Sequence, residues 1–177
     1  MPSCMLRPEL ALSPPDSRTF VVGFWSPKIG IILARIVYSP CEGGVLARFR
    51  IIVADDSPAL LRKLTSLLEV DFDVVATATD GKFALDLIRR YEPDVVVLDL
   101  GMPMLNGMEV TRELARHSPP VVICSVETDP EVVEAARRAG ALAYVFKVRV
   151  EKDLISAVKS VLQGKPFGLM PLQHGSG

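Results

Sequence analysis

Five polar side chains stand where short apolar runs end, and these are the positions at which the sequence could do chemistry. Asp55 and Asp56 follow IIVA, Asp99 follows VVVL, Ser125 closes VVICS and Lys147 follows AYVF. A carboxylate at the end of a buried strand has no structural use, because a charge withdrawn from water is costly unless it is paired. The acids therefore indicate a functional site.

The three acids have the composition of a magnesium site. If their strands lie side by side and parallel, Asp55, Asp56 and Asp99 meet in one crevice, where like charges repel. A divalent cation removes this repulsion, and Mg²⁺ is typically held by one or two carboxylates together with phosphate oxygens. We expect Mg²⁺ as the cofactor.

Ser125 and Lys147 add a hydroxyl and an ammonium group to the same edge of the sheet. Asp99 could then attack phosphorus as a nucleophile, as carboxylates do when aspartyl phosphates form. Mg²⁺, Lys147 and Ser125 would neutralise or hydrogen-bond the transferring oxygens. Each residue alone also fits a plain structural role, such as a helix N-terminus, a turn or a solvated charge. Their agreement at four strand ends favours a phosphoryl site.

Alternating apolar strands and amphipathic helices would position these residues. We expect strands at 50–54, 72–78, 95–98, 121–125 and 143–146, and helices at 58–70, 81–91, 108–116, 130–139 and 151–162. Continuous Val and Ile runs indicate parallel strands that are covered on both faces. With right-handed crossovers, we predict an α/β doubly wound five-stranded parallel sheet with five helices, in the flavodoxin-like order 2-1-3-4-5.

Composition narrows the class of protein. The chain has 177 residues, a formal net charge of -1 and 49% hydrophobic residues, which is not the basic profile of a nucleic-acid binder. Cys4, Cys41 and Cys124 show no zinc-ligand spacing and fit a reducing cytosol, so we expect a cytoplasmic protein. Cys124 lies inside an apolar run and is interpreted as a small buried hydrophobe.

The chain divides into three expected parts: an N-terminal extension at 1–47, the domain at 48–164 and a C-terminal tail at 165–177. The extension carries six prolines and no sustained hydrophobic period. It is either poorly ordered or a start-site artefact, with translation beginning near Val45. Its apolar stretch 20–38 contains Lys28 and Arg35, and charges at mid-membrane cost about 2.5–3.5 kcal/mol each, so no membrane span is expected.

From about Arg48 to Gly164 the chain resembles a response-regulator receiver domain of bacterial two-component systems, with the fold of the chemotaxis regulator. The resemblance rests on the segments IIVADDSP, VVVLDLGMPMLNGMEV, VVICS and GALAYVFK. They contain the acid pair, the phosphoacceptor position Asp99, a Pro103 and a Gly107 at the family's usual offsets, the hydroxyl and the lysine.

The resemblance implies a role for each matching residue. Asp99 would accept a phosphoryl group from the phosphohistidine of a sensor histidine kinase. Asp56, Asp99 and the carbonyl of Gly101 would ligate Mg²⁺, with Asp55 acting mainly through water. Ser125 and Tyr144 would form the switch. The surface of the fourth helix, fifth strand and fifth helix would then contact a downstream protein or a second copy. Such a protein is a phosphoacceptor switch that catalyses its own phosphoryl transfer and dephosphorylation, and it is not expected to be an enzyme.

One residue departs from the family pattern. Proline usually follows the lysine, often after a cis peptide bond, whereas Val148 follows Lys147 here. A trans bond is expected, because a non-proline cis bond costs about 2.5–4 kcal/mol. The change leaves every phosphorylation residue in place.

Three functions remain open. The first is a phosphorylation switch that acts through protein contacts. The second is a remnant of a LuxR-type transcriptional regulator, since SVLQGKPFGLMP resembles the linker of such proteins, yet too few residues follow for a helix-turn-helix and no direct nucleic-acid binding is expected. The third is a haloacid-dehalogenase-type enzyme, which needs a second acid where this chain has Gly101.

Overall fold

The computed structural model describes residues 20–26, 30–36, 48–115 and 119–169, which fall into two compact units, Met1–Ala47 and Arg48–Gly177. In the first unit, β1 (Phe20–Ser26) pairs antiparallel with β2 (Gly30–Ile36). Neither strand was expected from the sequence, although both runs are rich in the Val, Ile and aromatic residues that favour strands. Among the described residues, no helix is long and apolar enough to cross a membrane.

The second unit contains the predicted sheet. Its strands are β3 (Arg50–Ala54), β4 (Asp73–Ala78), β5 (Val95–Leu98), β6 (Val121–Ser125) and β7 (Ala143–Phe146). They are all parallel and lie in the order β4-β3-β5-β6-β7. Counted within this unit, that is the order 2-1-3-4-5, so the predicted fold is confirmed.

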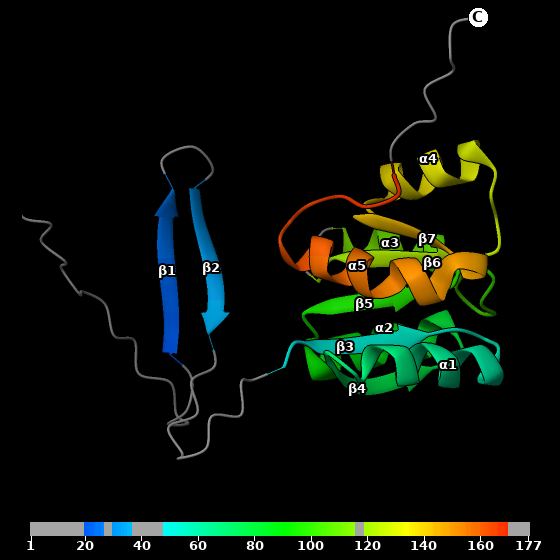
Figure 1. Cartoon of the computed structure of the whole chain (residues 1–177), viewed down its shortest axis with the longest axis horizontal. Helices are drawn as coiled ribbons and strands as arrows, with labels where there is room; N and C mark the ends of the chain where they lie inside the picture. The colour runs from blue at the N-terminus through cyan, green and yellow to red at the C-terminus, as the bar shows by residue number, and fades with distance from the viewer. Residues whose placement is uncertain (1–19, 27–29, 37–47, 116–118, 170–177) are drawn as a thin grey trace, which may run out of the picture. The chain divides into compact units, whose positions relative to one another are not determined.

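Helices cover both faces of the sheet (Figure 1). They are α1 (Pro58–Leu68), α2 (Gly81–Tyr91), α3 (Gly107–Leu114), α4 (Pro130–Ala139) and α5 (Val150–Leu162). Side chains of α1 and α5 pack on one face in a single apolar cluster, and those of α2, α3 and α4 pack on the other. β3 and β5 lie between both layers and are almost wholly buried, as their continuous Val and Ile runs predicted.

Capping residues fix where the helices begin and end. Asn106 and Glu109 form a capping box at the start of α3, each side chain bonding the other's backbone N–H at 2.9 Å. Asp129 caps α4, and Gly140 ends it in the left-handed region with φ 108°. Each crossover therefore returns the chain to the same edge of the sheet.

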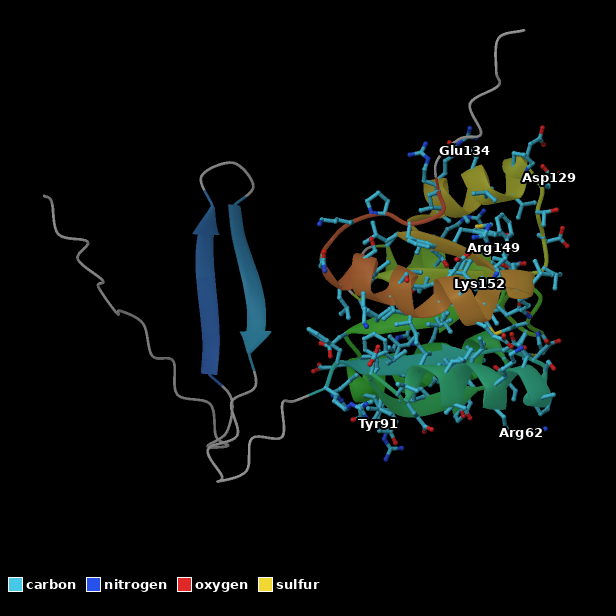
Figure 2. All side chains as sticks on the ribbon, in the orientation of Figure 1. Arg62, Tyr91, Asp129, Glu134, Arg149 and Lys152 are labelled. Atoms are coloured by element: carbon cyan, nitrogen blue, oxygen red, sulfur yellow. The ribbon has the colours of Figure 1, made fainter. Side chains whose placement is uncertain are left out.

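The structure differs from the sequence-based expectation at two ends. α1 stops at Leu68 instead of Val70, and a short 3-10 helix, η1 (Lys147–Arg149), precedes α5. Figure 2 labels Arg149, the last residue of η1, and Lys152, near the start of α5. No peptide bond in the described residues is cis, which agrees with the expected trans bond before Val148.

Candidate functional site

The main chain carries two acids past the ends of their strands in register. The N–H of Asp55 donates to the carbonyl of Ala78 at 3.1 Å, and the N–H of Asp99 donates to the carbonyl of Ala54 at 2.9 Å. The parallel ladder of β4, β3 and β5 therefore continues one residue beyond Ala54. Because β3 and β5 are paired, Asp55 and Asp99 lie next to each other.

Three of the four predicted metal ligands, the three acids, come together. Asp55, Asp56 and Asp99 each offer a carboxylate oxygen, and these oxygens lie within 4.8 Å of one another. Asp55 is fully buried and Asp99 is 5% exposed, whereas Asp56 reaches the surface. The Oδ1 of Asp55 also accepts the N–H of Ser57 at 2.9 Å, which ties this carboxylate to the start of α1.

Lys147 bridges the two buried acids. Its Nζ lies 2.8 Å from Oδ2 of Asp55 and 3.0 Å from Oδ1 of Asp99. Burial by itself lowers the pKa of Lys147, but the contacts with both carboxylates outweigh burial and raise it. The lysine is therefore held as a cation between two anions, in a group of three acids that it cannot neutralise alone.

The donor set fits a hard divalent cation. Oδ2 of Asp55 is buried and contacts only Nζ of Lys147 among the described residues, at 2.8 Å, which leaves this oxygen a second lone pair for another ligand. Gly101 leaves room beside Asp99. A side chain at this position would crowd the carboxylate, because its Cβ would lie only 3.3 Å from Oδ2 of Asp99. Carboxylate oxygens with unused lone pairs are the ligands that Mg²⁺ prefers.

Gly107 lies against the backbone of the central acid. A Cβ at this position would come within 2.1 Å of the carbonyl oxygen of Asp99. Any larger residue would therefore push α3 away from β5. The family offset quoted for Gly107 thus has a steric reason in this chain.

Ser125 and Tyr144 both hydrogen-bond the main chain of the same residue, Glu127. Ser125 is 2% exposed, and its Oγ accepts the N–H of Glu127 at 3.2 Å. The carbonyl of Glu127 accepts the hydroxyl of Tyr144 at 3.0 Å, and the Tyr144 ring is buried. Burial raises the pKa of Tyr144, with the Ser125 hydroxyl acting in the opposite direction, so the phenol stays protonated and can donate.

Glu127 was not among the predicted site residues. It acts through its main-chain N–H and carbonyl, and a backbone contact leaves no signal in residue type or spacing. Cys124, one residue before Ser125, is fully buried as predicted. Burial raises the pKa of its thiol to about 12, so it remains a neutral, unreactive neighbour of the site.

Comparison with known proteins identifies the family. The response regulator receiver domain family matches residues 51–159. The chain belongs to this family. This receiver domain therefore lies within the second unit and contains every predicted site residue.

Individual relatives agree with the assignment. The receiver domain is 36% identical over 124 residues to the transcriptional regulatory protein DegU of Brevibacillus brevis, a match that covers 68% of this chain and 52% of DegU. Protein PilH of Pseudomonas aeruginosa is 35% identical over 119 residues, covering 65% of this chain and 98% of PilH. The chain thus spans about half the length of DegU and nearly all of PilH.

A solved structure has the same fold. The signal receiver domain of the response regulator NarL from Mycobacterium tuberculosis superposes with a TM-score of 0.64 at 29% identity, over 67% of this chain and 98% of that one. The receiver fold derived from the strand order is therefore found in a related protein of known structure.

Proposed function

We propose that this receiver domain is a phosphoacceptor switch in which Asp99 takes a phosphoryl group from a sensor histidine kinase, with Mg²⁺ bound at the acids. The observation that supports this most strongly is Lys147, whose Nζ contacts Asp55 and Asp99 at 2.8 and 3.0 Å. Two buried carboxylates beside one ammonium are costly for a purely structural contact. The arrangement suits a site at which further charge arrives and leaves.

The transfer requires little from the protein beyond position and charge. A carboxylate oxygen of Asp99 attacks phosphorus, a new O–P bond forms, and the P–N bond to the donor imidazole breaks. The electron pair stays on the imidazole nitrogen, which takes up a proton. Lys147 faces the transferring oxygens, and Ser125 offers them its hydroxyl proton.

Mg²⁺, when bound, neutralises charge on the phosphoryl oxygens. The carboxylates of Asp56 and Asp99 and the carbonyl of Gly101 would hold it, with Asp55 acting mainly through water. The hard oxygen donors of the three acids support this assignment. Asp55 also has the role of holding Lys147 in place.

The output is proposed to be a protein contact, in the cytoplasm, through the face formed by α4, β7 and α5 or through a second copy. The match to PilH spans 98% of that protein, so a receiver domain with little else is the whole of one relative. The remnant of a LuxR-type regulator is therefore not the favoured explanation. Gly101, in place of a second acid, argues against the dehalogenase-type enzyme.

Acetyl phosphate provides the direct test. The full chain is incubated with Mg²⁺ and acetyl phosphate, and intact mass spectrometry measures addition of one hydroxylamine-labile phosphate. We expect it on the wild type and on Asp86→Asn, an exposed acid on α2, and not on Asp99→Asn. A wild type that stays unmodified, or an Asp99→Asn variant modified to the same extent, would disprove the proposal.

A further inference from the structure

Five residues beyond the expected domain boundary return to the open edge of the sheet. Phe167 forms a parallel bridge with Ala143 of β7. Its N–H donates to the carbonyl of Leu142 at 3.1 Å, and its carbonyl accepts the N–H of Tyr144 at 2.9 Å. β7 is the last strand of the sheet, so residues 165–169 cover part of an edge that would otherwise be unpaired. We call these residues the clasp.

The clasp holds Tyr144 by its backbone and by its surroundings. Gly168 has a φ of +68°, and a Cβ there would lie 2.2 Å from the carbonyl oxygen of Tyr144, so this contact needs glycine. Leu169 is only 7% exposed and belongs to the same buried cluster as Tyr144 and Ala141. Because Leu169 and Tyr144 share this cluster, we expect the loss of Leu169 to loosen the packing around the Tyr144 ring.

Hydrogen-bond bookkeeping links Tyr144 to Asp99 through Ser125. A serine hydroxyl has one proton and two acceptor sites. Oγ of Ser125 accepts the N–H of Glu127, and the Ser125 hydroxyl also interacts with Tyr144 and lowers the pKa of that phenol, so a phosphoryl oxygen on Asp99 would take this proton from Tyr144. The Tyr144 hydroxyl fixes the carbonyl end of the same Glu127. The inward position of Tyr144 thus keeps Ser125 ready to donate.

We propose that the clasp is a positioning element for phosphoryl transfer, which holds Tyr144 inward and thereby sets the Ser125 hydroxyl. The proposal rests on the proposed phosphorylation of Asp99. Linkage is reciprocal, so a phosphoryl group that is bound better with the clasp docked must also tighten the clasp. The state of Asp99 is in this way transmitted to the chain that follows Leu169.

Leu169→Ala in the full chain tests the forward direction. With Mg²⁺ and acetyl phosphate, we expect the initial rate of phosphorylation to fall about fivefold, less than the roughly hundredfold loss seen when a whole charge-stabilising donor is deleted. Lys152→Ala is the control, because Lys152 is exposed near the start of α5 and lies outside the clasp. This control should leave the rate of phosphorylation unchanged. Leu169→Met, which keeps a large apolar side chain, should react at close to the wild-type rate.

A double-mutant cycle separates positioning from general loosening of the fold. In a Ser125→Ala background the clasp has no hydroxyl to position, so Leu169→Ala should cause no further loss of rate. The reciprocal measurement is amide hydrogen exchange with beryllofluoride as the phosphoryl mimic. Exchange at the N–H groups of Tyr144 and Phe167 should slow several-fold on its addition, and not in Ser125→Ala.

The outcomes distinguish the two proposals. If the wild type takes no phosphate, the proposed function fails and the clasp proposal fails with it. If the wild type is phosphorylated but Leu169→Ala reacts at the same rate, or loses the same factor with and without Ser125, only the clasp proposal is overturned. Unchanged exchange at Tyr144 and Phe167 would overturn it as well.

Discussion

Two groups of charged side chains in the receiver domain are built from the same chemistry and behave differently. At the surface of α4, Glu134 accepts two hydrogen bonds from Arg137 at 2.7 Å and one from Arg138 at 3.1 Å. Figure 2 shows Glu134 on α4 at the surface of the domain. At the ends of β3 and β5, Lys147 instead serves two buried acids.

The balance of charge separates the two groups. On α4, two cations satisfy one carboxylate in water, and an exposed pair of this kind contributes little to stability. In the crevice, one cation serves two buried carboxylates, and a third acid lies nearby. Buried charges that are not balanced by partners destabilise the folded state unless a ligand binds them. The excess of buried acids therefore indicates that the crevice, and not the group on α4, is a functional site.

The largest effect is expected when the crevice loses its cation. Lys147→Met leaves Asp55 and Asp99 buried without a partner and should lower the free energy of unfolding by about 3–5 kcal/mol in the absence of Mg²⁺. Urea denaturation followed by circular dichroism measures it. Lys152→Met, at an exposed position at the start of α5, is the control and should change little. Equal losses in the two variants would mean that the buried bridge has no special weight.

Magnesium should stabilise the crevice and leave the α4 group unaffected. Binding to the folded state alone contributes about 2.7 kcal/mol when the free ion is at one hundred times its dissociation constant. Thermal melts with and without Mg²⁺ should therefore differ by roughly 10 °C for a domain of this size. The double variant Asp55→Asn/Asp56→Asn should lose that difference. A shift that persists in the double variant would place the ion elsewhere.

The smallest effect is expected at α4, and it depends on pH. The hydrogen bonds from Arg137, with a smaller contribution from Arg138, outweigh the opposing effect of desolvation and lower the pKa of Glu134 from 4.5 to about 2. Because the folded-state pKa is the lower one, the stabilisation is present above pH 4.5 and is lost as the pH falls from there towards 2.

Glu134→Gln should reproduce that loss. At pH 7 its melting temperature should lie only slightly below that of the wild type, and the gap should close as the pH falls from 4.5 towards 2. Melts in a series of buffers measure the gap. A gap that stays constant across this range would show that ionisation of Glu134 does not contribute.

Much of the receiver domain could be predicted because its signals are local. Val and Ile runs between amphipathic helices indicate covered parallel strands, and capping residues such as Asp129 and Gly140 mark the start and the end of one helix. The antiparallel pair β1 and β2 had no comparable signal, since its residues show no sustained alternation. The short helix η1 was also missed, because Val148 excluded a cis proline turn without indicating what replaces it.

The site residues likewise include some that the sequence predicted and some that it did not. Five predicted residues lie at or just after the carboxyl end of a strand: Asp55, Asp56, Asp99, Ser125 and Lys147. Because the strands are parallel, these ends lie on the same side of the sheet, and the residues meet there. The role of Glu127 could not be anticipated, because it offers only backbone groups. Burial of Leu169 was likewise hidden, since a short stretch after Gly164 with no period reads as a tail.

The sequence by itself determined the fold class and the chemical groups at the edge of the sheet, because periodicity and strand-end residues are properties of short segments. Only the tertiary structure decided that Lys147 lies between two acids, that Tyr144 bonds the carbonyl of Glu127, and that residues 165–169 pack on β7. Those contacts join residues that are distant along the chain. Their geometry depends on packing between elements, which no short segment specifies.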